Sequence, residues 1–236
     1  MPLILAIEAS GPRCSVALGD GNFLFERTLD RPREHHALVL ALASELLAEA
    51  GKQPADLAAI AFGRGPGSFT GVRIAVAFAQ GLGFALSLPL VPVCSLHALA
   101  LDAHRRAGAD GAETRVAVAV DAHMGELYCA LFQREGDAVV PLPLPVLQQV
   151  SHHVFPAGCA PADTLLAGDG WTQYPAIRPE AARLLADAGP GAACVLELAR
   201  AAGKEAWIAA RDAEPSYVRG VSAWKTREAQ AAALRG

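Results

Sequence analysis

Two carboxylates and one glycine-rich loop are the groups in this chain whose types and spacing could support chemistry. Glu8 and Asp121 each end an apolar, strand-like run, one in each half of the chain. In a cleft between two lobes, such a carboxylate can hold Mg²⁺ against a nucleotide. Residues 63–73, Gly-Arg-Gly-Pro-Gly-Ser-Phe-Thr-Gly-Val-Arg, separate an apolar strand-like run from an apolar helix-like run. A phosphate-binding loop would occupy that place, so nucleotide binding is the first hypothesis.

The glycine-rich loop nevertheless departs from the standard phosphate loops. Its marked residues are Gly63, Gly65, Pro66, Gly67, Ser68, Phe69, Thr70, Gly71 and Arg73. A Walker loop needs Lys and Ser or Thr after its last glycine, whereas Gly71 is followed by Val and Arg. A dinucleotide fingerprint needs a third glycine where Ser68 or Thr70 stands. We therefore expect a tight strand-to-helix turn, with Thr70 as a candidate cap for the helix.

The carboxylates have a structural alternative to metal binding. The turn after Glu8 is Ser-Gly-Pro-Arg, and its proline lacks an N–H donor that a phosphate cradle would use. We interpret Glu8, Ser10 and Asp121 as a degenerate cleft in which each carboxylate accepts hydrogen bonds from its own turn. The seven histidines include no His-x-x-x-His pair, and the five cysteines include no Cys-x-x-Cys pair. We expect no metal site and identify no catalytic residue.

The order of predicted elements indicates a duplicated α/β fold. Hydrophobic periodicity predicts strands at 3–9, 14–19, 22–29, 57–62 and 90–93, and helices at 36–50 and 72–87. This βββαβαβ order begins again with strands at 115–120, 126–133, 138–144 and 165–167, although the second copy is poor in helix. Two such units form the actin-like (ASKHA, ribonuclease H-like) architecture of two lobes. We predict an N-terminal lobe at 1–110 and a smaller, degenerate C-terminal lobe at 111–236.

The two helices of the first half carry more apolar residues than one sheet face can cover. Gly71, Ala75, Ala79 and Gly83 recur every four residues, which forms a ridge of small side chains on one helix face. Either the protein wraps around these helices, or a partner chain covers them. For the second case the expected interface residues are Val39, Leu42, Ala43, Ala75, Val76, Ala79 and Gly83. In the first case the ridge packs on the chain's own sheet.

Composition limits the classes of protein. The chain of 236 residues is 53% hydrophobic and 19% charged, as expected of a soluble globular protein. Its net charge of −4 disfavours binding RNA without a partner. The uncharged segment 74–93 is long enough to span a bilayer, but glycines and prolines interrupt it, so we expect no membrane span. The N-terminus lacks the basic region of a signal peptide, and we expect a cytoplasmic protein.

Over most of its length the chain resembles the bacterial TsaB family, also called YeaZ. The resemblance rests on Cys-Ser-Val-Ala-Leu at 14–18, the loop at 63–73, Asp-Ala-His-Met-Gly-Glu-Leu-Tyr at 121–128 and Pro-Ser-Tyr-Val-Arg at 215–219. The family usually has Asp-Thr-Ser where this chain has Glu-Ala-Ser at 8–10, and commonly has Arg at the position of His123. The first departure weakens the hypothesis of a Mg²⁺ carboxylate at Glu8.

The resemblance implies a function in tRNA modification. It implies a non-catalytic subunit that binds a TsaD homologue through the two helices, together with the ATPase TsaE. The complex transfers a threonylcarbamoyl group to the adenosine beside the anticodon of tRNAs that read codons beginning with A. The isolated chain would then hold no cofactor, ATP or ADP would bind at the subunit boundary, tRNA would bind only through the complex, and the free chain could form a homodimer.

Two hypotheses from other classes stay open at this point. The two carboxylates and the fold suggest a stand-alone ATP-dependent small-molecule kinase. A metalloprotease, a function sometimes attached to the broader family, is disfavoured because the chain has no His-x-x-x-His pair.

Overall fold

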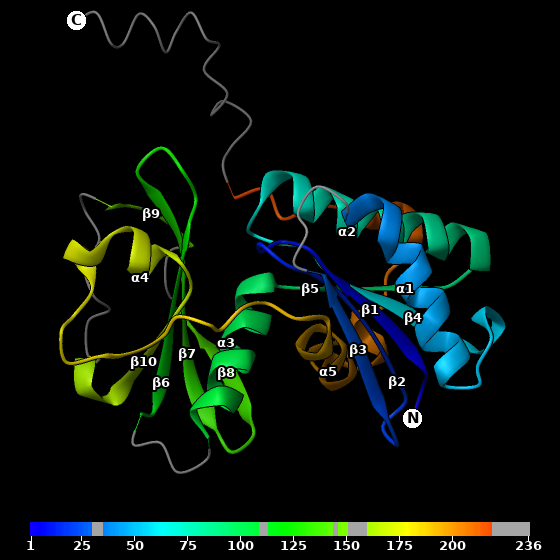
Figure 1. Cartoon of the computed structure of the whole chain (residues 1–236), viewed down its shortest axis with the longest axis horizontal. Coiled ribbons are helices and arrows are strands. Elements are labelled where there is room, and N and C mark those ends of the chain that lie inside the picture. The colour runs from blue at the N-terminus through cyan, green and yellow to red at the C-terminus, as the bar shows by residue number, and fades with distance from the viewer. Residues whose placement is uncertain (30–34, 109–112, 144–145, 151–159, 219–236) are drawn as a thin grey trace, which may run out of the picture.

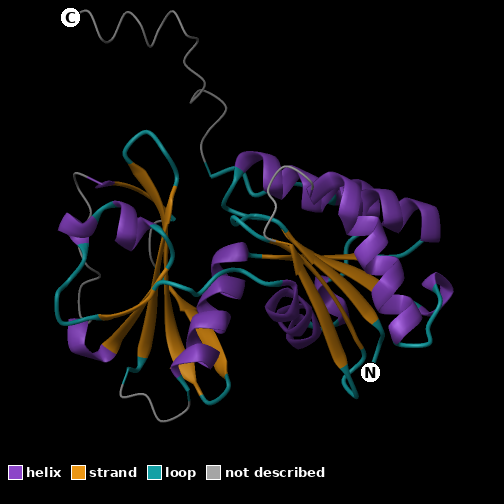
Figure 2. Cartoon of the chain, in the orientation of Figure 1, coloured by secondary structure: helices purple, strands orange, loops and turns teal. Residues whose placement is uncertain are grey.

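Two mixed β-sheets lie side by side, with helices between them and on their outer faces (Figures 1 and 2). The computed structural model describes residues 1–29, 35–108, 113–143, 146–150 and 160–218. Sheet order and register show that the chain is an α/β protein with the actin-like arrangement of two lobes, as predicted.

The first sheet has five strands in the order β3-β2-β1-β4-β5. Their bounds are β1 (Ile4–Glu8), β2 (Cys14–Gly19), β3 (Leu24–Leu29), β4 (Ala59–Gly63) and β5 (Leu90–Val93). The first three strands form an antiparallel meander, while β4 and β5 run parallel to β1. Parallel pairing places the ends of β1 and β4 at the same edge of the sheet. The glycine-rich loop therefore starts beside the turn that follows β1.

The second sheet repeats this order as β11-β10-β6-β7-β8, and β9 pairs with β7. Its strands are β6 (Arg115–Asp121), β7 (Glu126–Glu135), β8 (Ala138–Leu142), β9 (Leu147–Gln149), β10 (Thr164–Ala167) and β11 (Arg183–Leu185). The lead strand β6 is antiparallel to β7 and parallel to β10, as β1 is to β2 and β4. The predicted duplication is confirmed.

Five helices complete the layers, and their bounds are α1 (His35–Glu49), α2 (Phe69–Leu86), α3 (Ser95–Ala107), α4 (Gly170–Gln173) and α5 (Ala192–Ala202) among the described residues. Helices α1 and α2 cover the outer face of the first sheet, and α4 covers the outer face of the second (Figure 1). Helices α3 and α5 lie between the sheets and share one apolar core with both. Short 3₁₀ turns occur at Pro54–Asp56, Pro161–Asp163, Pro175–Ile177, Lys204–Ala206 and Ala210–Asp212.

Several element boundaries differ from those predicted. Helix α2 begins three residues before the predicted start, and its N-cap is Ser68, whose Oγ accepts the N–H of Gly71 at 3.3 Å. The prediction that Thr70 caps the helix is therefore wrong, because Thr70 already lies in the first turn. Helix α3, which follows β5 directly, was not predicted. Most of its alanines and leucines are buried, because the helix packs between the two sheets.

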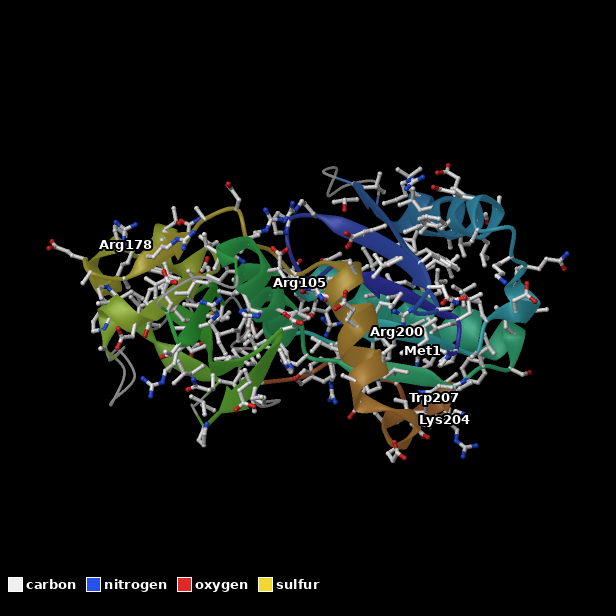
Figure 3. All side chains as sticks on the ribbon, turned by 90° about the horizontal axis from the view of Figure 1, so that it is seen from below. Met1, Arg105, Arg178, Arg200, Lys204 and Trp207 are labelled. Carbon is white, nitrogen blue, oxygen red and sulfur yellow. The ribbon has the colours of Figure 1, made fainter. Side chains whose placement is uncertain are left out.

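The last described segment returns to the first lobe. Ile208 forms an antiparallel bridge with Leu90 of β5, and Gln80 of α2 donates from Nε2 to the carbonyl oxygens of Ala210 at 3.3 Å and Ala213 at 2.9 Å. Figure 3 shows α5, with Arg200, and the following turn, with Lys204 and Trp207, on the same side of the molecule as Met1. A division near residue 110 separates the two sheets, but the segment that starts with α5 packs on the first one.

Helix α2 is also long and apolar enough to cross a membrane by length and composition, with 33% of its 18-residue window buried inside the protein. Its buried face packs on the first sheet. Core helices of soluble proteins have the same composition.

Candidate functional site

The glycine-rich loop packs directly on the turn between β1 and β2. A Cβ at Gly67 would lie 2.6 Å from the carbonyl oxygen of Ser10, and a Cβ at Gly71 would lie 2.9 Å from the carbonyl carbon of Ala9. Both distances are too short for any side chain. Gly65 has a φ of +89°, which favours glycine. The glycines thus allow two backbone segments to approach closely, as expected of a structural turn.

The polar groups of this loop bond to the protein itself. The hydrogen bonds run from Arg64 N to Val93 O (2.9 Å), from Gly65 N to Ser95 Oγ (3.1 Å), from Ser68 N to Ser10 O (2.7 Å) and from Val72 N to Ser68 O (2.9 Å). A phosphate cradle needs several backbone N–H groups that point at the anion. These four donors are already used and are not available to a phosphate group.

Glu8 fills the space beside this loop. Its side chain is fully buried, Oε1 accepts the N–H of Ser10 at 2.6 Å, and Oε2 accepts the hydroxyl of Ser95 at 2.9 Å. Burial raises the pKa of the Glu8 carboxyl, and the hydrogen bonds from the two serines lower it by less. A buried carboxyl that is bonded to its own turn cannot reach a metal ion in solvent. The predicted structural role of Glu8 agrees with these contacts.

Asp121 stands at the equivalent position of the second lobe. Its Oδ1 accepts the N–H of His123 at 2.9 Å, just as Glu8 accepts the N–H two residues later in the first lobe. Asp121 Oδ1 also accepts the hydroxyl of Tyr174 at 3.0 Å, and Asp169 Oδ1 accepts the Asp121 N–H at 2.9 Å. Glu8 and Asp121 share none of these partners, so the predicted cleft carboxylates serve two separate turns.

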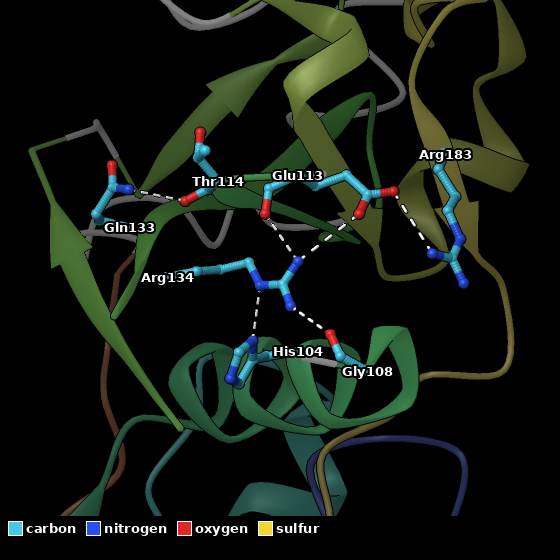
Figure 4. A network of polar contacts seen from close by, with 7 residues as sticks. All are labelled: His104, Gly108, Glu113, Thr114, Gln133, Arg134 and Arg183. Carbon is cyan, nitrogen blue, oxygen red and sulfur yellow. Dashed lines mark hydrogen bonds and ion pairs between the residues drawn. The ribbon is translucent and has the colours of Figure 1, made fainter. Parts of the chain in front are cut away.

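Metal ligands are not gathered anywhere in the described residues: no group of three or more His, Cys, Asp or Glu side chains there could hold an ion. A network of polar contacts lies elsewhere, where α3 leads into the second sheet (Figure 4). Arg134 of β7 donates from Nε to Nδ1 of His104 at 2.7 Å, from Nη2 to the carbonyl oxygen of Gly108 at 2.6 Å and from Nη1 to that of Glu113 at 2.7 Å. This network joins both ends of the connection between the lobes and has a structural role.

The predicted partner interface is wrong in its residues. All seven lie in the chain's own core, between the first sheet and helices α1 and α2, and none is more than 8% exposed among those with a stated exposure. The residues concerned are Val39, Leu42, Ala43, Ala75, Val76, Ala79 and Gly83. The small-residue ridge lets α2 approach the end of β1 at Gly71, where the backbone of Ala9 leaves no room for a Cβ, and lets it pack closely on Leu90 of β5 and on Ala210 at Gly83. The alternative prediction, packing on the chain's own sheet, is correct.

A second ridge of small residues lies on the opposite face of α2. Ala77, Gly81 and Ala85 also recur every four residues, and all three are exposed. A Cβ at Gly81 would meet nothing within 4 Å. We call this exposed side the outer face of α2, and it comprises Phe69, Thr70, Arg73, Ile74, Ala77, Phe78, Gly81, Phe84 and Ala85. Sequence reasoning missed it, although its four-residue repeat was a signal as clear as that of the buried ridge.

The outer face of α2 is apolar and partly hollowed. Phe69 is 56% exposed, Phe84 is 63% exposed, and Leu40 on the adjacent α1 is 50% exposed. A shallow pocket of about 320 Å³ lies over the first half of the helix, between Phe69 and Phe78. These three large exposed apolar side chains lie on two helices that pack against each other. This surface is a candidate protein interface.

Fold and site together define a class of protein: an actin-like, two-lobed protein whose glycine loop is closed by internal hydrogen bonds and whose α1–α2 layer presents an apolar surface. Comparisons with known proteins then identify the family. The family model described as TsaD, tRNA N6-adenosine threonylcarbamoyltransferase, matches residues 30–210. The tRNA threonylcarbamoyladenosine biosynthesis protein TsaB of Escherichia coli is 37% identical, with 94% of this chain and 96% of that protein covered.

Two further comparisons match nearly the whole chain. TsaB of Haemophilus influenzae is 32% identical, with 94% of this chain and 95% of that protein covered. The solved structure of YeaZ from Pseudomonas aeruginosa superposes with a TM-score of 0.79 at 34% identity, and covers 92% of this chain and 100% of that one. The chain belongs to the TsaB family, also called YeaZ.

Proposed function

We infer that this chain is a non-catalytic subunit in the biosynthesis of threonylcarbamoyladenosine in tRNA, and that it acts by binding a homologue of TsaD. In this role it stabilises or positions the transferase while a threonylcarbamoyl group passes to the adenosine beside the anticodon. A TsaE-type ATPase completes the complex, and any ATP or ADP binds at a boundary between subunits. The complex works in the cytoplasm, and tRNA contacts this chain only within it.

The observation that carries this proposal is the outer face of α2. Exposed apolar surface is costly in water, at roughly 25 cal/mol for each Å². Phe69, Phe84 and Leu40 expose large apolar side chains on the neighbouring helices α1 and α2. The small residues Ala77 and Gly81 between them allow a helix of another chain to approach closely. In the free protein the same face can pair with a second copy.

The closed glycine loop supports a role without catalysis. Gly65 and Ser68 donate their N–H groups within the protein, and Glu8 is buried in the adjoining space. An ATP-dependent kinase would need those donors and a solvent-accessible carboxylate for its metal. The kinase alternative therefore has no geometric support in the described residues.

Reconstitution tests the proposal. TsaD and TsaE homologues from the same organism are incubated with threonylcarbamoyl-adenylate and tRNA, with and without this chain. We expect modification to depend on the chain, and the Ala77→Arg variant to lose both copurification with the TsaD homologue and the stimulation. Val140→Arg is the matched control, since Val140 is an exposed apolar residue of the second lobe. Equal rates without the chain would refute the proposed role.

A further inference from the structure

The C-terminal segment joins the first turn of α2 and the loop before it. The N–H of Ser216 donates to the carbonyl oxygen of Arg64 at 2.7 Å, inside the glycine-rich loop. One residue later, the hydroxyl of Tyr217 accepts a hydrogen bond from Nη2 of Arg73 at 3.3 Å. Residues 144 positions apart in sequence are thereby brought together at one end of the outer face of α2.

Arg73 is held in place by two aromatic rings. Its guanidinium carbon lies 3.4 Å from the ring centroid of Phe69 and 5.3 Å from that of Tyr217. Nη1 also donates to the carbonyl oxygen of Phe69 at 3.0 Å. Cation–π contacts of this kind, together with the hydrogen bonds, restrict a side chain that is otherwise flexible. Both rings are exposed, Phe69 by 56% and Tyr217 by 63%.

The cluster keeps donors that can reach another molecule. Arginine has five N–H donors, and two are used in the bonds to Phe69 and Tyr217. Because the Tyr217 oxygen accepts from Arg73, its own hydroxyl hydrogen remains to be donated. The two side chains are 3.3 Å apart, so one carboxylate can accept from both. No carboxylate of the described residues forms an ion pair with Arg73.

The geometry points to Arg73, clamped by Phe69 and Tyr217, as the polar anchor of the outer face of α2, where it binds a carboxylate side chain of the partner protein. This inference rests on the proposed function and adds the chemistry of the contact. Arg73 is the single formal charge in α2 and lies at the end of an apolar surface. Arginine and tyrosine beside aromatic rings are the side chains most often found at the energetic centres of protein interfaces.

An RNA phosphate fits this cluster less well than a carboxylate. Binding to a nucleic acid backbone gains its strength from several cations at once. The outer face has one, and the chain has a net charge of −4. An apolar surface with one fixed cation is complementary to a helix that carries one acidic side chain.

Titration calorimetry of the chain with the TsaD homologue of the same organism tests the inference. We expect Arg73→Gln to weaken binding at least tenfold, and Tyr217→Phe, which keeps the ring but loses the donor, to weaken it several-fold. Arg178→Gln is the matched control, because Arg178 is an exposed arginine on the second lobe, far from the first-lobe residues Met1 and Lys204 (Figure 3). The affinity of Arg178→Gln for the TsaD homologue should equal that of the wild type.

Double-mutant cycles then identify the carboxylate. Single Asp→Asn and Glu→Gln variants of the TsaD homologue are titrated against the wild type and Arg73→Gln. We expect one acidic position whose replacement weakens the wild type but has no further effect on Arg73→Gln. The inference is overturned if Arg73→Gln binds as tightly as the wild type, or if only tRNA binding by the complex is weakened. If Arg73→Gln leaves the affinity for the TsaD homologue unchanged while Ala77→Arg abolishes binding, the proposed function stands and only the role of Arg73 is refuted. If the wild type does not bind the TsaD homologue, the proposed function and the role of Arg73 are both refuted.

Discussion

The carboxyl group of Glu8 occupies the space that a side chain at Gly63 would need, since a Cβ at Gly63 would lie 2.5 Å from Cδ of Glu8. The two residues end the parallel strands β1 and β4. The carboxyl group of Glu8, the candidate metal ligand, thus fills the space beside the first glycine of the loop that was the candidate phosphate site. Because the carboxyl is fully buried, its pKa is raised above the ordinary glutamate value of 4.5.

The free energy of unfolding of the Glu8→Gln variant, relative to that of the wild type, should increase as the pH rises. The folded protein retains a proton on Glu8 that the unfolded chain loses above pH 4.5, so wild-type stability falls as the pH rises from 4.5 to the folded pKa. The loss is about 1.4 kcal/mol for each unit by which folding raises the pKa. Glutamine stays neutral, so urea unfolding at pH 5 and pH 8 should show a relative gain for the variant at pH 8. The exposed Glu45→Gln serves as control, and a difference that does not change with pH would contradict the prediction.

Two glycines of the same helix should respond oppositely to alanine. Gly71→Ala places a Cβ 2.9 Å from the carbonyl carbon of Ala9 and should destabilise the protein by about 3 kcal/mol or more, because backbone must move. Gly81→Ala meets nothing within 4 Å and should stabilise α2 by up to about 1 kcal/mol. Denaturant midpoints compare the two variants directly. Equal effects would show that the close approach of α2 to the first strand is wrong.

These two glycines also show how far the sequence predicts the structure. The five strands of the first sheet, four strands of the second, both early helices and the duplication follow from local periodicity, which each segment carries by itself, whereas the short strands β9 and β11 were not predicted. Gly71 and Gly81 belong to two four-residue repeats of small residues on one helix, and nothing local distinguishes them. The difference is the carbonyl of Ala9, which comes from another strand. The choice between a buried and an exposed face of α2 therefore needed the structure.

The hydrogen bonds of the glycine-rich loop also depend on distant parts of the chain. Departures from the phosphate-loop patterns were visible in the sequence, and they pointed correctly to a structural turn. The acceptors that satisfy the loop, Ser10 O and Ser95 Oγ, come from β1–β2 and from α3. Helix α3 was not predicted, so these bonds could not be.

Arginine substitutions at Ala77 and Ala79 of α2 should have different effects, one on association and the other on folding. Ala79 is fully buried, and Ala79→Arg forces a charge into an apolar core, which should unfold the chain. Ala77 is exposed, and Ala77→Arg should change the free energy of unfolding by no more than about 0.5 kcal/mol. Thermal melts followed by circular dichroism test both. A folded Ala79→Arg variant would mean that the buried ridge faces solvent.

Removal of Arg134 should destabilise the connection between the lobes. Its side chain is 7% exposed and bonds the carbonyl oxygens of Gly108 and Glu113 (Figure 4). Arg134→Met keeps much of the packing volume but removes the donors to Glu113, Gly108 and His104, at a cost of roughly 0.5–1.5 kcal/mol for each hydrogen bond lost. Denaturant unfolding measures the loss. Arg183→Met, at a more exposed arginine near Glu113, is the control and should cost less.

The bond between Arg134 and His104 should make the protein sensitive to acid. Nδ1 of His104 accepts the Arg134 donor at 2.7 Å, which requires a neutral ring. Burial first, and the charge of Arg134 second, lower the pKa of His104 below its ordinary value of 6.5. The unfolded chain therefore binds a proton near pH 6.5 that the folded protein refuses, so this contribution is complete above pH 6.5 and is lost as the pH falls through the folded pKa.

Unfolding free energies at pH 7.5 and 5.5 test this sensitivity. His97, whose pKa is also lowered by burial, adds a loss of the same sign at the lower pH, whereas the buried Glu8, whose pKa is raised, adds a gain. The test is therefore the difference between the wild type and a His104 variant at each pH. His104→Gln, whose amide oxygen can accept from Arg134, should weaken less over the same interval. The wild type measured over the same interval is the reference. If His104→Gln and the wild type change in stability by the same amount between the two pH values, the neutral His104 does not contribute to the acid sensitivity.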